Sequence, residues 1–249
     1  MQLYFIRHGQ SQNNAIWDET AGIDGKRLSD PLLTPKGVLQ AQLAGHFLGQ
    51  QSLEIPRNRT DVQNRNGFGL THLYCSLMER AIQTGVILSE VLQIPLVGMP
   101  ELHEVGGIYL ETLSDGLPVY SIEHGLLPEE IHARYPSLKL SGLIDGKGWW
   151  RGGREERNAL LPRAYRIIEM LKDRHAGTED RVGIITHGGI FSYIFRVLFH
   201  LEVKDDGESG LPFQIILNNC GISRFDLTDE GTFFLYHNRT DFLPDDLIT

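Results

Sequence analysis

Apolar residues along this chain fall into short continuous runs that alternate with longer segments of helical spacing. The first run, residues 3–6, is followed at once by Arg7 and His8. Two similar runs occur in "LTHLYCS" and "RVGIITHGG". A continuous apolar run is typical of a parallel strand that is covered on both faces. We therefore expect these three segments to be buried strands.

The segments between the runs repeat their apolar residues every three to four positions, which predicts helices. In "LLTPKGVLQAQLAGHFLGQ", Thr34 is the expected N-cap and Pro35 the first helical residue. Further helices are expected over residues 78–91, around 160–171 and from 188 to about 200, and short strands near 213–217, 221–227 and 232–237. Strands that alternate with helices predict an α/β fold with three layers, α/β/α, around a mixed, mostly parallel sheet.

One segment interrupts the alternation. Residues from about 106 to 153 are rich in glycine and proline, and we expect them to hold only a short helix, near residues 128–135. We interpret this segment as a lid-like insertion above the sheet, within a single domain that spans residues 1–249. Because loops carry specificity, the insertion is expected to form the outer wall of any pocket below it.

Composition narrows the possible functions. The 249 residues carry a net charge of −9, which argues against nucleic acid or an anionic membrane as a general partner. No apolar run approaches the roughly 20 residues that a membrane helix needs, and we expect no secretory signal. The only cysteines, Cys75 and Cys220, suit a reducing compartment. We expect two buried free thiols, with a disulfide as the alternative, and a cytoplasmic location.

Basic side chains follow the predicted strands. His8 and His187 each end a strand before a glycine, and the second strand leads into Arg80. Because the carboxyl ends of parallel strands meet at one edge of a sheet, where such sheets bind ligands, these residues and Arg7 should converge. Guanidinium groups match phosphate oxygens in pairs, and the helix after His187 would add backbone donors. The sequence therefore predicts a phosphate site.

The same residues could perform phosphoryl transfer. Nearby positive charge would lower the pKa of His8, and an unprotonated imidazole can attack phosphorus. A protonated imidazole at His187 would stabilise charge on the transferred group. Glu101 and Glu104 both follow a predicted strand and could protonate the departing oxygen. The like charge of a bound phosphate would raise the pKa of such a carboxyl group, as a general acid requires.

Four motifs occur in a fixed order along the chain: "RHGQSQNN", "SLMERAIQT", "LHEVGG" and "THGG". Together with "LLTPKG", they resemble the phosphatase branch of the histidine phosphatase superfamily, which is also called phosphoglycerate mutase-like. The resemblance implies that His8 is the nucleophile and becomes phosphohistidine, and that Glu104, rather than Glu101, is the general acid. The residues that it assigns to the phosphoryl group are Arg7, Asn14, Arg80, His187 and Gly188.

The chain departs from the cofactor-dependent mutases that it resembles. They carry a basic residue directly after the acid, where this chain has Val105, and further basic residues that hold a second phosphate. Arg134, Arg151 and Arg154 cannot be aligned with those residues. We therefore expect hydrolysis of phosphomonoesters, with a phosphomutase as the alternative. A phosphate-binding module without catalysis is a further alternative, although the complete set of histidines and the acid argues against it.

Neither a metal nor a cofactor is expected. The sequence contains no HExxH or P-loop motif, and clustered arginines would repel a cation. The expected partner is a phosphorylated small molecule, bound through its phosphate. The three short strands at the C-terminal end leave an edge that could pair with a second copy of the chain.

Five further residues are candidates for contact with the substrate. Gln10 and Ser11 follow the first histidine and either touch the ligand or hold the turn. Tyr109, Trp149 and Trp150 lie in the insertion and would suit a substrate larger or more apolar than phosphate. For the tryptophan pair we favour the alternative that they anchor the insertion to the core. Three other histidines are expected on the surface of helices or strands, namely His46, His72 and His175.

Overall fold

The computed structural model describes residues 1–20, 27–50, 61–114, 117–141, 148–150, 152–201 and 215–249. Within these residues, one sheet of seven strands is formed. Its order is β6 (Lys139–Leu140), β3 (Leu96–Gly98), β2 (His72–Cys75), β7 (Arg181–Thr186), β1 (Gln2–Arg7), β8 (Ile222–Thr228) and β9 (Gly231–Arg239). The first five strands in this order run parallel, β8 pairs antiparallel with β1, and β9 pairs antiparallel with β8. The predicted mixed, mostly parallel sheet is confirmed.

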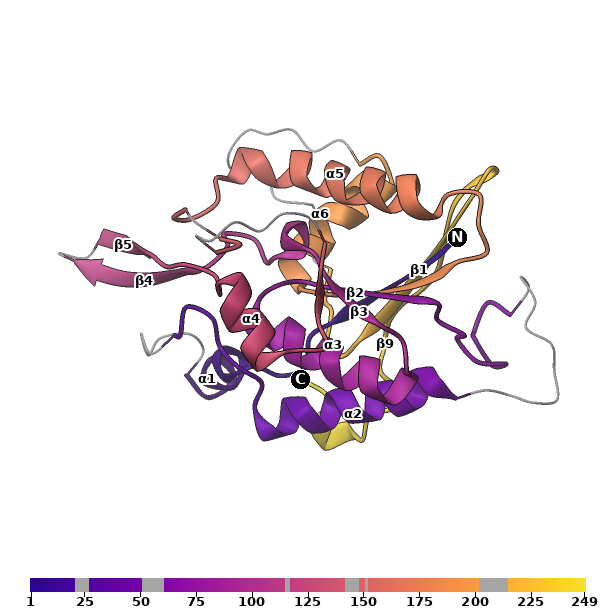
Figure 1. Ribbon diagram of the computed structural model, residues 1–249, viewed down its shortest axis with the longest axis horizontal. Helices are drawn as coiled ribbons and strands as arrows, with labels where there is room; N and C mark the ends of the chain where they lie inside the picture. Colours follow the sequence, from indigo (N-terminus) through magenta and orange to yellow (C-terminus); the bar gives the residue numbers. More distant parts are fainter. Residues whose placement is uncertain (21–26, 51–60, 115–116, 142–147, 151, 202–214) are drawn as a thin grey trace.

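Helices cover both faces of the sheet. The described helices are α1 (Gln12–Thr20), α2 (Pro35–Gly49), α3 (Glu79–Leu92), α4 (Pro128–Arg134), α5 (Arg157–His175) and α6 (Gly188–Leu198). Figure 1 shows α5 and α6 above the sheet and α2 and α3 below it. Within each of these pairs the two helices pack against one another. The three-layer α/β/α architecture that the sequence predicts is therefore confirmed.

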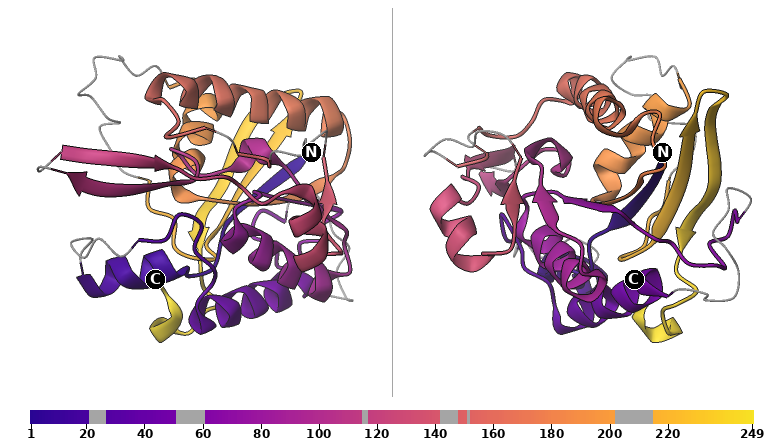
Figure 2. Two further views of the ribbon diagram at one scale, coloured as in Figure 1. Left: turned by 60° about the vertical axis from the view of Figure 1, so that its left-hand side comes forward. Right: turned by 45° about the vertical axis from the view of Figure 1, so that its right-hand side comes forward.

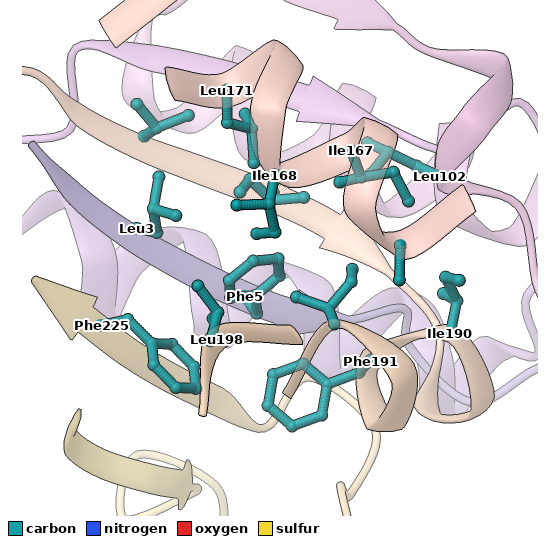
Figure 3. Close-up of a cluster of buried hydrophobic side chains, with 14 of the residues drawn as sticks. Leu3, Phe5, Leu102, Ile167, Ile168, Leu171, Ile190, Phe191, Leu198 and Phe225 are labelled. Atoms are coloured by element: carbon teal, nitrogen blue, oxygen red, sulfur yellow. The ribbon is translucent and has the colours of Figure 1, made fainter. Parts of the chain in front are cut away.

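The continuous apolar run of β1 follows from this layering. Successive side chains of a strand point to opposite faces. Leu3 and Phe5 belong to the core beneath α5 and α6, and Tyr4 and Ile6 to the core over α2 and α3. Figure 3 shows the first of these cores, where the Phe5 ring meets Phe191 edge to face at 5.6 Å between centroids. A strand buried on both sides has no solvent face, so the run shows no alternation.

The local signals for α2 are also confirmed. Thr34 caps the helix, because its hydroxyl accepts a hydrogen bond from the Gly37 N–H at 3.1 Å. Pro35 occupies the first turn, where its missing N–H costs nothing. The buried face of α5 includes Ile167 and Leu171, as the helical spacing predicts.

Three elements differ from the sequence-based predictions. The segment from 106 to 153 holds more than a short helix: β4 (Tyr109–Ser114) and β5 (Leu117–Ile122) form a separate hairpin, and β6 joins the edge of the main sheet. Figure 2 shows the hairpin extending away from the layers. Helix α1 has no buried residue and hence no apolar stripe to reveal it. The strand expected at 213–217 is not formed at residues 215–217, and its first two residues lie outside the described ones.

Two simpler expectations concern the thiols and the membrane. Cys75 and Cys220 are both free and buried, as predicted. Burial raises the pKa of the Cys220 thiol to about 12. Among the described helices, none has the length and apolar character to cross a membrane.

Candidate active site

Three neighbouring strands, β2, β7 and β1, end level with one another. The register pairs Ile185 of β7 with Ile6 on one side and with Cys75 on the other. The first residues after the three strands are therefore side by side. The structure brings the expected groups together: the ring centroids of His8 and His187 are 5.0 Å apart.

His8 lies at the centre of this cluster and is buried. Its Nδ1 is 2.7 Å from the carbonyl oxygen of Gly9, to which it donates, so Nε2 is the nitrogen that carries the lone pair. That Nε2 accepts a hydrogen bond from Nε of Arg80 at 3.1 Å. Burial, together with the charges of Arg80 and Arg7, lowers the pKa of His8 well below its ordinary value. The imidazole is therefore neutral, as the sequence predicts for a nucleophile.

The loop after β1 is fixed against α2 and α3. A side chain at Gly9 would collide with the carbonyl group of Gly37 in the first turn of α2, so only glycine permits this approach. The Gly9 N–H donates to Oγ1 of Thr84 at 3.0 Å. The Thr84 hydroxyl in turn donates to the backbone carbonyl of Arg80 at 2.8 Å. These contacts fix the backbone next to His8 relative to the backbone of Arg80.

His187 is fully buried and lies at the N-cap of α6. Its Nε2 is 2.8 Å from Oγ of Ser76, which also accepts a hydrogen bond from the Met78 N–H at 3.2 Å. Because the serine hydroxyl can either donate to Nε2 or accept from it, this contact fits both tautomers of the ring. Nδ1 is buried and has no partner among the described residues. Burial and then Arg80 lower the pKa of His187 well below its ordinary value. The ring is neutral in this site, whereas the sequence pattern predicts a protonated one.

Two arginines supply the positive charge. Arg7 donates from Nη1 to the carbonyl oxygen of Leu217 at 2.5 Å. Arg80 is buried and forms an ion pair with Asp30, with 3.6 Å between Nη1 and Oδ1. Burial lowers the pKa of both guanidinium groups, and the charge of Glu104 opposes this for both. Both groups stay charged at any physiological pH.

Glu104 binds the start of α6. Its carboxylate accepts hydrogen bonds from the backbone N–H groups of Val105 at 2.8 Å, Ile190 at 2.9 Å and Gly189 at 3.1 Å. A helix N-terminus is a natural site for an anion. The donors that the sequence predicts for phosphate are thus partly occupied by this carboxylate. Gly188 begins the helix, and a Cβ placed on it would meet no atom within 4 Å.

Asn14 is linked to the backbone of His8 through one intermediate residue, Asn219. Its Oδ1 accepts hydrogen bonds from the N–H and the hydroxyl of Ser11, at 3.1 and 3.0 Å, and from Nδ2 of Asn219 at 3.3 Å. Asn219 also donates to the backbone carbonyl of His8 at 2.8 Å. Sequence reasoning missed Asn219, because no pattern near it indicates a partner 211 residues away.

Gln10 and Ser11 hold the turn after His8. Oε1 of Gln10 accepts a hydrogen bond from the Thr34 hydroxyl at 2.8 Å, and its Nε2 donates to Asp18 at 3.2 Å. Ser11 is buried and bonded to Asn14. Of the two alternatives left open by the sequence, the structure favours the structural one for both residues.

The aromatic residues of the insertion pack within it. Nε1 of Trp150 donates to the carbonyl oxygen of Ile108 at 3.1 Å, and a side chain at Gly107 would collide with its ring. Trp149 packs against the core over α2 and α3. The Tyr109 ring meets Tyr120 at 5.6 Å between centroids. These contacts support the interpretation that the tryptophans anchor the insertion.

The basic residues of the insertion are engaged with other groups. Arg134 of α4 donates to Oε1 of Glu79 at 2.9 Å. Arg154 donates to the Tyr120 hydroxyl at 3.1 Å and lies over its ring. Arg151 is outside the described residues. Arg27, which sequence reasoning did not select, is exposed, and its charge reaches Arg80.

Asp30 is a second residue that the sequence did not reveal. Its carboxylate accepts a hydrogen bond from the backbone N–H of Glu79 at 3.1 Å and pairs with Arg80. Burial raises the pKa of Asp30 to about 7, although the charge of Arg80 opposes this. Asp30 therefore becomes ionised near neutral pH, and it contacts Arg80, a candidate for binding phosphate.

Replacing Asp30 with asparagine should make stability less dependent on pH. Between the ordinary value of 3.8 and about 7, native Asp30 keeps a proton that the unfolded chain releases. The native state therefore loses stability through this group as the pH rises. Relative to the wild type, the Asp30→Asn variant should gain roughly 2 kcal/mol between pH 5 and pH 8. Urea unfolding at both pH values, with exposed Asp173→Asn as the control, measures this; a constant difference would contradict it.

The family model of the histidine phosphatase superfamily (branch 1) matches residues 119–240. A probable phosphoglycerate mutase of Yersinia enterocolitica is 26% identical over 227 residues, which cover 91% of this chain and 85% of that protein. A probable phosphoglycerate mutase of Yersinia pestis is 25% identical over 234 residues, with the same coverage.

Solved structures show the same fold. An alpha-ribazole phosphatase from Shigella flexneri has a TM-score of 0.57 at 20% identity, with 96% of each chain covered. A mycobacterial glucosyl-3-phosphoglycerate phosphatase has a TM-score of 0.55 at 20% identity, covering 96% of this chain and 99% of its own. A phosphoserine phosphatase from Entamoeba histolytica has a TM-score of 0.54 at 17% identity, covering 98% and 99%. At such identities the likeness concerns the fold alone.

Proposed function

We propose that this chain, a member of the histidine phosphatase superfamily, hydrolyses phosphomonoesters of small molecules through a phosphohistidine on His8. One observation carries the proposal. The His8 ring is neutral, its Nδ1 is held by the Gly9 carbonyl, and its Nε2 lone pair faces Arg80, one of the two arginines whose charges lower its pKa. The same site therefore holds both a nucleophile and the cations that would bind the phosphate of a substrate.

In the first proposed step, the substrate phosphate binds Arg7 and Arg80, and the Arg80 N–H that contacts His8 turns to a phosphate oxygen. Nε2 of His8 then attacks phosphorus, and the bond from phosphorus to the ester oxygen breaks. Glu104, in its protonated form, gives its proton to the departing oxygen. Nδ1 of His187 is buried and has no partner among the described residues, and in the tautomer that carries its proton there it would donate to a phosphoryl oxygen.

In the second proposed step, water attacks the phosphohistidine. Glu104, now a carboxylate, takes a proton from that water, and the bond between Nε2 and phosphorus breaks. Inorganic phosphate leaves, and His8 is again neutral. The carboxylate is then the form that accepts the three backbone N–H groups at the start of α6.

Hydrolysis is preferred to phosphoryl transfer between positions of one substrate. A mutase must hold a bisphosphate while it is turned, which needs a second group of cations. Arg134 and Arg154 are engaged by Glu79 and Tyr120. Val105, directly after the acid, packs against the core beneath α5 and α6. The curated relatives are named probable phosphoglycerate mutases, so a mutase is the second candidate.

The experiment that tests the proposal is rapid quenching after mixing with labelled p-nitrophenyl phosphate or labelled 3-phosphoglycerate, followed by mapping of phosphohistidine. Label on His8, with free phosphate released, supports hydrolysis. Label that returns from His8 to a second position of the phosphoglycerate identifies a mutase. If no label is trapped and no substrate of a broad panel is turned over, the site binds phosphate without catalysis.

Removal of divalent metals should leave the activity unchanged. The proposed steps use only the side chains of His8, Glu104, His187 and the two arginines, so no step needs a metal ion. After dialysis against EDTA, we expect the rate of p-nitrophenyl phosphate hydrolysis to stay within about twofold of the untreated rate. A loss that added zinc or magnesium restores would contradict the mechanism.

The place of action is also part of the proposal. Two free, buried thiols are compatible with a reducing compartment, and we propose that the protein acts in the cytoplasm.

A further inference from the structure

A second cluster of chemically active side chains lies at the opposite end of the sheet from His8. His72 is the first residue of β2, Asp180 directly precedes β7, and His175 is the last residue of α5. Each side chain offers one ligand atom, and these atoms all lie within 4.8 Å of one another. Strand β7 separates the cluster from His187 by roughly 20 Å, at about 3.3 Å per residue.

Asp180 connects the two imidazoles. Its Oδ2 is 2.9 Å from Nδ1 of His175, and its Oδ1 is 3.9 Å from Nδ1 of His72. The two rings meet edge to face at 4.7 Å between centroids. Asp180 thus lies in contact with one imidazole and close to the other, so the three side chains form one compact group.

His175 is oriented in the way that a ligating histidine usually is. The sequence predicts it on the surface, but it is buried, because Tyr74 of β2 and Asp180 enclose its ring at the end of α5. Its Nε2 is 3.0 Å from the Tyr74 hydroxyl. Metal-bound imidazoles typically donate their second N–H to such an oxygen, which fixes the ring and leaves the other nitrogen free to ligate. Nδ1 then faces Asp180 as the ligand atom.

The backbone around the cluster is fixed by the sheet. The Thr71 N–H donates to the carbonyl oxygen of Arg181 at 2.8 Å, and the Arg181 N–H donates to the Thr71 hydroxyl at 3.0 Å. The Asp180 carbonyl accepts from the Gln2 N–H at 2.8 Å. Only side chains need to move for the ligand atoms to close on an ion. The His72 side chain is 42% exposed, which leaves a path from solvent, and its Nδ1 must exchange a 2.9 Å contact with the Thr71 hydroxyl for the ion.

We propose that His72, His175 and Asp180 bind a divalent transition-metal ion, with zinc as the preferred occupant. Two imidazole nitrogens and one carboxylate oxygen form a donor set that suits zinc, and a fourth position remains for water.

The charges near the cluster limit the affinity that we expect. Arg174 lies over the Tyr74 ring, with 5.6 Å from its guanidinium carbon to the centroid. With one carboxylate ligand and the Arg174 cation nearby, the site should bind zinc with roughly micromolar rather than nanomolar affinity. Its effect would be structural, since the ion would fasten the end of α5 to the starts of β2 and β7. Stabilisation would follow mass action, and activity would not depend on it.

The test measures zinc binding by calorimetry, and thermal unfolding with and without zinc chloride, on protein first freed of metal. We expect one zinc ion per chain and a zinc-dependent rise of the unfolding temperature in the wild type. The variant His72→Ala should lose both, because it removes an exposed ligand and leaves the buried His175 in place. The exposed His46 of α2 provides the control His46→Ala, which should keep both.

Two results would overturn the metal site: binding that does not saturate at one ion per chain, or equal zinc binding by the wild type and His72→Ala. Cobalt offers a second readout, because imidazole and carboxylate ligation produces visible absorption that His72→Ala should lack. None of these measurements uses enzymatic turnover, so their failure is independent of the proposed phosphatase activity.

Discussion

Replacing His8 with alanine should reduce phosphomonoester hydrolysis by about 10⁴-fold or more, because the variant has no group that can accept the phosphoryl group at that point. Nε2 of His8 is the neutral nitrogen that lies against Arg80. The measurement is kcat/KM with p-nitrophenyl phosphate, together with the search for trapped phosphohistidine after rapid quenching. The label should be absent in the variant.

A phosphate-binding measurement distinguishes the loss of the nucleophile from misfolding of the His8→Ala variant. Arg7 and Arg80 remain in His8→Ala, so phosphate should still raise the unfolding temperature of the variant. Free imidazole, which fits the space left by the ring, should restore part of the turnover. His46→Ala is the matched control for a histidine outside the site, and it should keep full activity. Retention of most activity by His8→Ala would exclude His8 as the nucleophile.

Replacing Glu104 with glutamine should slow substrates according to their leaving group. An alkyl phosphate releases a strongly basic oxygen and needs a proton donor, so its kcat/KM should fall by about 10² to 10⁴-fold. The p-nitrophenolate ion is stable without a proton, so p-nitrophenyl phosphate should be affected far less. The comparison of glycerol phosphate with p-nitrophenyl phosphate measures the difference. Glu101→Gln, which alters an exposed carboxylate paired with Arg166, is the control.

A loss of activity in Glu104→Gln could also have a structural cause, and the comparison of the two substrates distinguishes that cause from the loss of a general acid. Glu104 binds the N–H groups of Gly189 and Ile190, so its side chain also positions the first turn of α6. If positioning were its only role, Glu104→Gln would reduce the hydrolysis of both substrates by the same factor. Equal losses would therefore argue against Glu104 as the general acid and would favour its role as an anchor of α6.

Much of the fold could be predicted from local patterns in the sequence. The continuous apolar run before Arg7 indicates a strand with two buried faces, and Thr34 with Pro35 marks the start of α2. Parallel strands present their carboxyl ends at one edge, so the convergence of His8 and His187 followed once the strands were recognised. Each of these inferences needs only a short stretch of chain and the geometry of a parallel sheet.

The tertiary structure decided what depends on partners that are distant in sequence. Asn219 contacts the backbone of His8 across 211 residues, and Asp30, in the loop before α2, pairs with Arg80 of α3. Glu104 binds the start of α6, where the sequence pattern predicts bound phosphate. The burial that makes both central histidines neutral is likewise a property of the packed layers. Periodicity specifies which face of an element is apolar, but only packing selects the residues that meet there and the dielectric in which they titrate.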